Sequence, residues 1–204
     1  MELLVWLFND FETLDAFGPV EVLGKLPGPT EIRFISLHGG IVTSAQRVPV
    51  VTERYDLRRP GEGFILLIPG GMGTRKEIDH EPLLQALGQL ARSAGHILAV
   101  CTGAALLAKT GLLDRKEATS NKLAFDWVAG QGPDVQWVRK ARWVRAGNIY
   151  TSSGVSAGID MALGFVADQC GSGAAERIAA GIEYLWNRDR AADPFWNAAA
   201  PKPV

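Results

Sequence analysis

Cys101 stands in a sequence pattern typical of nucleophilic cysteines. It follows the apolar run Ile97–Val100 and precedes a segment rich in alanine and leucine. Small residues, Ala99 and Gly103, stand two positions before and after it, the spacing of a nucleophile elbow, a strand-to-helix turn too tight for larger side chains there. Such a turn places the sulfur at the carboxyl edge of a sheet, where a helix N-terminus stabilises a thiolate. The pattern predicts that Cys101 is a reactive, partly accessible thiol of low pKa.

A structural role is the alternative to a reactive thiol for either cysteine. A free cysteine is often only a small buried hydrophobe, and this alternative stays open for Cys101. Cys170, the other of the two cysteines, precedes Gly171 near the end of an expected helix, and we predict that it is buried and inert. A disulfide framework is not needed in a chain of this size.

A second turn rich in glycine follows another apolar run. Phe64–Ile68 leads into Pro69, Gly70 and Gly71, and glycines at a strand end let backbone N–H groups approach a ligand closely. We therefore expect the amides of Gly71 and Thr102 to form an oxyanion hole. The glycine spacing does not match a dinucleotide-binding fingerprint, and we expect neither a cofactor nor a metal ion.

Histidine is the usual partner of a catalytic thiol, but the three histidines do not favour a Cys–His pair. His96 begins the strand that Cys101 ends, about 16 Å away at the opposite edge of the sheet. His80 precedes a helix and is expected at the surface. His38 ends a strand and stays open as a partner of the thiol.

A carboxylate can take the place of histidine. Asp15 follows the first expected strand and is surrounded by Leu14, Ala16 and Phe17, which disfavours a solvated position. Burial raises the pKa of a carboxyl group, so that it can both donate and accept a proton near neutral pH. The alternative is that Asp15 caps the first helix.

The elements that must position these residues alternate along the chain in the rhythm of an α/β fold. Continuous apolar runs, typical of parallel strands buried on both faces, are Leu3–Phe8, Ile32–Leu37, Phe64–Ile68 and Ile97–Val100. Further strands are expected at Val135–Val138, Trp143–Arg145 and Ile149–Thr151, with a hairpin at Gly147-Asn148, and an antiparallel excursion at Ile41–Thr52. Helices are expected at Leu14–Leu23, Glu81–Ser93, Ala104–Lys109, Lys122–Ala129, Ser156–Gln169 and Gly173–Arg188.

Length and composition favour one compact domain. The chain has 204 residues, 47% of them hydrophobic, and we expect a domain over residues 1–190 followed by a C-terminal arm over 191–204. A formal net charge of −1 without charge runs argues against a nucleic-acid or membrane surface. The apolar start lacks a basic flank and a cleavage site, so we expect a cytoplasmic protein.

The sequence HILAVCTGAALLAKTGLLDRKEAT, with LDAFGPVEVL, ILLIPGGMG, ATSNKLAFDWV and SGVSAGIDMAL, resembles the ThiJ/PfpI superfamily over roughly Leu3 to Glu183. The resemblance implies a flavodoxin-like, three-layer α/β sandwich with a mostly parallel central sheet, of the class I glutamine amidotransferase-like type. Within the superfamily, Thr102 directly after the cysteine is similar to the isonitrile hydratase branch, whereas protease-like members have histidine there.

The resemblance implies roles for single residues. Cys101 would attack an isonitrile to give a thioimidate, Asp15 would act as acid and base, Thr102 would position the reactants, and water would complete an N-substituted formamide. Gly70, Gly71, Gly103 and Asn121 would form the oxyanion and substrate site; Asn121 stands in a segment that departs from the aromatic-rich pattern of that branch.

Other functions for the same thiol remain open. They are a small-ligand or oxidative-stress sensor without catalysis, and a glyoxalase-like enzyme acting on 2-oxoaldehydes. The expected partners are a small-molecule substrate and a second copy of the chain, since superfamily relatives pair near the active edge and tryptophans such as Trp186 and Trp196 are expected at the surface.

Overall fold

The computed structural model describes residues 1–56 and 63–197, and within them one sheet of eight strands has the order β3-β4-β2-β1-β5-β6-β10-β9. The strands are β1 (Glu2–Trp6), β2 (Glu31–Ser36), β3 (Gly40–Thr43), β4 (Pro49–Arg54), β5 (Ile65–Ile68), β6 (His96–Val100), β9 (Trp143–Ala146) and β10 (Ile149–Ser152). Pairing is parallel from β4 to β10 and antiparallel at the two outer pairs, β3 with β4 and β9 with β10. The expected antiparallel excursion and the hairpin at Gly147-Asn148 are therefore confirmed.

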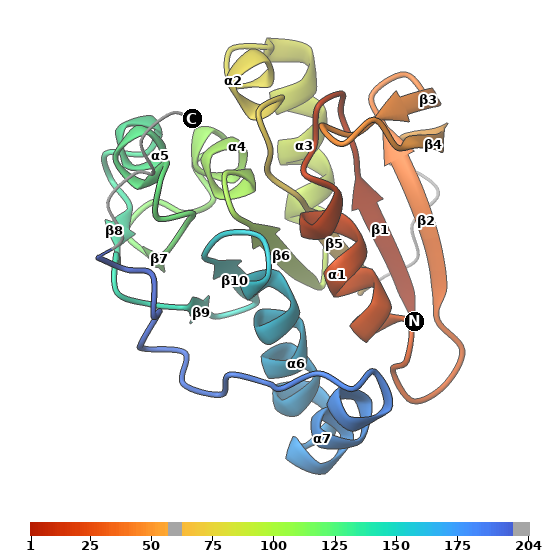
Figure 1. Ribbon diagram of the computed structural model, residues 1–204. Coiled ribbons are helices and arrows are strands. Elements are labelled where there is room, and N and C mark those ends of the chain that lie inside the picture. The colour runs from red at the N-terminus through yellow and green to blue at the C-terminus, as the bar shows by residue number, and fades with distance from the viewer. Residues whose placement is uncertain (57–62, 198–204) are drawn as a thin grey trace.

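Helices cover both faces of this sheet. They are α1 (Thr13–Leu23), α2 (Thr74–Glu77), α3 (Glu81–Ser93), α4 (Gly103–Lys109), α5 (Phe125–Gln131), α6 (Ala157–Cys170) and α7 (Ser172–Gly181). Figure 1 shows α1 and α6 together on one face, with α7 against α6, and α3 behind the sheet. The three layers and the mostly parallel sheet confirm the predicted fold class.

The central strands explain why the sequence shows continuous apolar runs. Side chains that point to either face of β1, β5 and β6 are covered by helices, so residues in succession, such as Ile65, Leu66 and Leu67, are all fully buried. Burying a side chain of this size contributes roughly 1.5 to 3 kcal/mol to folding. The same strands run parallel, so the loops that follow β1, β5, β6 and β10 meet at one edge of the sheet.

Two predicted elements are shorter than expected or shifted. The strand expected at Val135–Val138 is only β8 (Gln136–Trp137), which pairs with β7 (Glu117–Ala118) in a small separate sheet. The helix expected at Lys122–Ala129 begins at Phe125, because the preceding residues form a turn in which Ala124 N–H donates to the Asn121 side chain.

The helix expected at Gly173–Arg188 ends at Gly181. Beyond it the chain turns back to the buried carboxylate of Asp160, which accepts from the Tyr184 hydroxyl and the Asn187 N–H. Trp186 is therefore only partly exposed, and it donates from Nε1 to the Asp160 carbonyl oxygen. Trp196 is 39% exposed, as predicted.

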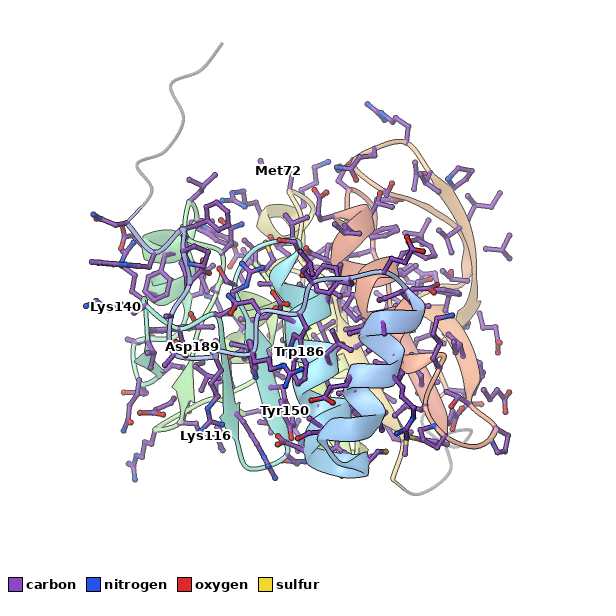
Figure 2. The ribbon with its side chains drawn as sticks, turned by 60° about the horizontal axis from the view of Figure 1, so that its bottom comes forward. Met72, Lys116, Lys140, Tyr150, Trp186 and Asp189 are labelled. Carbon is purple, nitrogen blue, oxygen red and sulfur yellow. The ribbon has the colours of Figure 1, made fainter. Side chains whose placement is uncertain are left out.

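The C-terminal segment crosses the molecule after α7. Figure 2 shows Trp186 and then Asp189 along this segment, which continues toward Lys140. There the Asp193 N–H donates to the Lys140 carbonyl oxygen at 2.7 Å, and the Asp193 side chain is buried. Of the expected arm, residues 198–204 lie outside the described part. Among the described residues, the helices are too short or too polar to cross a bilayer.

Candidate active site

Cys101 occupies the predicted elbow between β6 and α4. Its φ of +57° is a left-handed conformation that residues other than glycine seldom adopt. The turn is tight: a Cβ atom on Gly103 would lie 2.5 Å from the Ile68 carbonyl oxygen and 2.7 Å from that of Pro69. The Cys101 N–H donates to the Ser152 carbonyl oxygen of the neighbouring strand at 3.2 Å. Cys101 thus lies in the connection between β6 and α4, at the carboxyl edge of the sheet; Figure 1 shows these two elements.

Burial dominates the ionisation of the Cys101 thiol. The residue is only 5% exposed, and this desolvation raises the thiol pKa well above its ordinary value; the negative charge of Asp15 raises it further. The N–H groups of Thr102 and Val155 and the Asn121 side chain favour the thiolate but are outweighed. The expectation of a partly accessible thiol of low pKa is wrong, because desolvation exceeds the effect of the α4 N-terminus.

Cys170 also differs from its prediction. It is exposed at the last turn of α6, not buried. The exposed thiol of this chain is therefore Cys170, and the buried one is Cys101.

Asp15 lies inside the site from the first turn of α1. It is fully buried, and its Oδ2 accepts the Gly70 N–H at 2.9 Å; the Cys101 thiol and the Val155 N–H also donate to the carboxyl group. Burial raises the pKa of Asp15 to about 7; the Gly70 N–H opposes this shift, and the charge of Glu12 adds to it. The N-cap of α1 is Glu12, so the capping role considered for Asp15 does not apply.

Cys101 and Asp15 face each other directly. The thiol favours the ionised form of the carboxyl group, and the carboxylate disfavours the thiolate, so the two groups compete for one negative charge. The Val155 N–H stabilises the ionised form of both groups. Near neutral pH this arrangement keeps the proton on sulfur, while the Asp15 carboxyl group, with a pKa of about 7, is partly ionised and in its ionised form can take that proton.

Thr102 fixes the turn after β5. Its hydroxyl oxygen accepts the Gly71 N–H at 2.9 Å and lies 3.1 Å from the Thr74 hydroxyl, which donates to it. The Gly71 amide is therefore engaged, and the expected free Gly71 donor of an oxyanion hole is not present. Gly70 lies so close that a Cβ atom there would sit 2.5 Å from the Thr102 nitrogen and 2.9 Å from the Asp15 Oδ2.

Asn121 lies beside the thiol, as expected for a pocket residue. Its side chain hydrogen-bonds to Cys101, while its Oδ1 accepts the Ala124 N–H at 3.0 Å, which fixes which end of the amide faces the sulfur. A Cβ atom on Gly154 would lie 2.4 Å from Nδ2 of Asn121. Because Gly154 has no side chain, the Asn121 side chain can occupy this space.

The sequence prediction missed Val155. This β-branched residue has a φ of +45°, an unfavourable conformation that turns its N–H toward Cys101 and Asp15. One signal pointed to it: SGVSAG follows the strand Ile149–Thr151, and β10 is the direct neighbour of β6.

The histidines lie away from the thiol. His96 is at the opposite end of β6, where its ring packs edge-on against Phe165. His80 contacts Glu77 at 2.7 Å. His38 is exposed and follows β2, which lies three strands from β6, about 14 Å at the usual strand spacing. Among residues 1–56 and 63–197, acidic, histidine and cysteine side chains form no cluster suited to a metal ion.

Comparisons with known proteins identify the family and the fold. The model of the DJ-1/PfpI family matches residues 1–168. The isonitrile hydratase of Pseudomonas putida is 30% identical over 185 residues, covering 87% of this chain and 76% of the relative. A ThiJ/PfpI family protein from Pseudomonas syringae superposes with a TM-score of 0.78 at 27% identity, covering 98% of this chain and 78% of that one. DJ-1beta of Drosophila melanogaster shares the fold, with a TM-score of 0.75, 21% identity and coverage of 91% and 98%.

Proposed function

The chain belongs to the DJ-1/PfpI family, and from this membership and the juxtaposition of Cys101 with Asp15 we propose that it is a cysteine-dependent hydro-lyase that converts an isonitrile to an N-substituted formamide. One observation carries the proposal: a fully buried carboxyl group lies against a buried thiol that hydrogen-bonds to it, and among the described residues no histidine acts on either group. Similarity to an isonitrile hydratase supports the choice of substrate.

The first half of the reaction adds the thiol across the terminal carbon of the isonitrile. Asp15 accepts the thiol proton while sulfur attacks that carbon, so the buried site never has to hold a free thiolate for long. The same proton then passes from Asp15 to the carbon. An S–C and a C–H bond have formed, the product is a thioimidate on Cys101, and Asp15 is again a carboxylate.

Water completes the second half. The oxygen of a water molecule attacks the thioimidate carbon while Asp15 takes one proton from that water. Asp15 then passes this proton to the thioimidate nitrogen. The C–S bond breaks as the hydroxyl group becomes the carbonyl, and the second water proton passes from that hydroxyl oxygen to the leaving sulfur. The pKa of Asp15 of about 7 suits a group that must accept and return a proton in each half. The amides of Thr102 and Val155 and the Asn121 side chain, which favour negative charge on sulfur, stabilise it as it develops.

The burial of Cys101 favours catalysis over the sensor function. Oxidation of cysteine follows thiolate character and exposure, and this thiol has little of either. An isonitrile, by contrast, is small and uncharged. Its reaction needs no preformed thiolate, because the thiol proton is removed as the S–C bond forms.

Replacement of Asp15 tests the mechanism. Asp15→Asn keeps the size and an acceptor for the Gly70 N–H but removes the base, and we expect kcat for formamide formation to fall by about 10² or more. His38→Ala, at an exposed position, is the matched control and keeps the wild-type rate. Full activity in Asp15→Asn with loss in His38→Ala would show that the acid and base are wrongly assigned.

The same assay, run with 2-oxoaldehydes, tests the substrate. Consumption of a 2-oxoaldehyde without any turnover of isonitriles would contradict the hydratase proposal and favour the glyoxalase-like alternative. Turnover of neither, with ready oxidation of Cys101 by peroxide, would favour the sensor function.

A further inference from the structure

Four buried charged residues form a network behind the site. They are Lys122, Arg142, Asp160 and Asp193, each at most 7% exposed. The two cations and two carboxylates balance in charge. Buried ionic groups are costly to desolvate, and the loss of one partner leaves an uncompensated charge. Such a network therefore fixes the relative positions of the chain segments that carry its residues. Three of these segments bear on the surroundings of Cys101.

The first segment is the N-terminal end of α6. Arg142 donates from Nε and Nη2 to Oδ2 of Asp160, at 2.9 and 2.8 Å, and from Nη2 to the Ser156 hydroxyl at 3.2 Å. Ser156 is the direct neighbour of Val155, whose N–H contacts both Cys101 and Asp15. Arg142 thus holds one wall of the thiol site in place.

The second segment leads into α5. Lys122 Nζ donates to the Thr119 hydroxyl at 2.9 Å and to the Ala141 carbonyl oxygen at 2.7 Å. Lys122 directly follows Asn121, whose side chain contacts the sulfur. The ammonium group therefore anchors a second wall of the site from behind.

The third segment supplies the remaining charge. Asp193 lies on the C-terminal segment, beyond residues 1–168 that match the family model. Its Oδ2 lies 3.9 Å from Lys122 Nζ and its Oδ1 3.7 Å from Arg142 Nη1, and it is 1% exposed. Burial lowers the pKa of Lys122 to about 8; Arg139 and Arg142 act in the same direction, and Asp193 opposes them. Asp193 therefore favours the charged form of Lys122 and forms ion pairs with both Lys122 and Arg142.

We propose that Asp193 is a positioning residue for Cys101: through Lys122 and Arg142 it clamps together the two segments that carry Asn121 and Val155, and so keeps the thiol covered and oriented. The C-terminal segment thereby completes the active site without touching the reactants. This inference concerns the thiol alone and does not depend on which substrate the enzyme takes.

Alkylation by iodoacetamide, followed site by site by mass spectrometry, tests the proposal. In the wild type, exposed Cys170 reacts first and Cys101 slowly. In Asp193→Asn the walls loosen, and we expect the Cys101 rate to rise about tenfold while the Cys170 rate is unchanged, an opening that corresponds to about 1.4 kcal/mol. Lys122→Met breaks the same contact from the other side and should raise the Cys101 rate as well. This variant provides the test if Asp193→Asn does not fold.

Three controls separate positioning from general destabilisation. Asp189→Asn removes an exposed carboxylate from the same segment and keeps the wild-type rates. Leu90→Ala, on the buried face of α3, lowers the melting temperature without touching the network and leaves the Cys101 rate unchanged. The double variant Lys122→Met/Asp193→Asn breaks the same contact from both sides, so its Cys101 rate should stay raised but rise no further than in the single variants.

Two outcomes would overturn the proposal. One is a Cys101 rate in Asp193→Asn within about twofold of that in Asp189→Asn, which is the scatter expected of independent sites. The other is an equal rise in Leu90→Ala at a similar loss of melting temperature. Neither outcome bears on whether the protein turns over isonitriles, because the readout is alkylation.

Discussion

At the scale of single residues, desolvation sets the chemistry of the pair Cys101 and Asp15. Both groups hold their protons to higher pH than they would in water, because charge in this site is poorly compensated. The pair therefore starts the reaction with a neutral thiol and a carboxylate that titrates near neutral pH. A small uncharged electrophile is the kind of substrate that such a site can admit.

The raised pKa of Asp15 also predicts a dependence of stability on pH. The unfolded carboxyl group releases its proton near pH 3.8 and the folded one near 7, so the folded state binds more protons between these values. Stability contributed by Asp15 therefore falls as pH rises through this window, by about 1.4 kcal/mol per pH unit. We expect Asp15→Asn to gain melting temperature over wild type at pH 8 and little at pH 4. Equal differences at both values, measured by calorimetry, would contradict the buried, uncompensated carboxylate.

The sequence identified the residues that the local pattern reveals. The small neighbours of Cys101 predicted its turn, and the apolar neighbours of Asp15 predicted its burial. The pKa of Cys101 could not be predicted in this way, because it depends on how much protein covers the sulfur from segments distant in sequence. Val155 was missed for the same reason: a valine with positive φ looks like any other valine in the sequence.

At the scale of elements, the order of the strands assembles the site. β1, β5, β6 and β10 are consecutive neighbours, and the loops after them bring Asp15, Gly70, Cys101 and Val155 together. The apolar runs predicted these strands because buried parallel strands need apolar residues on both faces. The end of α7 at Gly181 could not be predicted, since the chain leaves the helix to bond Asp160 on a different element.

Close packing of the β5 and β6 turns predicts a severe effect at Gly70. In Gly70→Ala the added Cβ would meet the Thr102 nitrogen at 2.5 Å and the Asp15 Oδ2 at 2.9 Å, so both turns must shift. We expect kcat to fall about 10²-fold, as for a displacement of about 1 Å at a reacting group.

A glycine in open surroundings provides the control for this prediction. Gly130→Ala, inside α5 with nothing near the added Cβ, should keep full activity and gain up to about 1 kcal/mol of stability. Activity of Gly70→Ala equal to that of Gly130→Ala would contradict the close contact between the two turns.

At the scale of the whole molecule, the homodimer expected from the sequence stays a prediction. Ile41 and Val51 are paired across the β3–β4 hairpin at the end of the sheet, and they are 69% and 78% exposed. We expect the second copy of the chain to cover these two neighbouring apolar side chains. Light scattering should give a mass near twice the 22.0 kDa of one chain, and Val51→Asp should reduce it to one chain. A wild-type mass of one chain at micromolar concentration would refute the prediction.

The most direct test of the proposed function is turnover of an alkyl isonitrile by the purified protein in water enriched in ¹⁸O, with the product identified by mass spectrometry. We expect an N-substituted formamide that carries the label in its carbonyl oxygen, formed over many turnovers by the wild type. Cys101→Ala, with the same fold and Asp15 still present, should form none. Absence of labelled formamide with the wild type, or its formation at the wild-type rate by Cys101→Ala, would contradict the assignment of Cys101 as the nucleophile of an isonitrile hydratase.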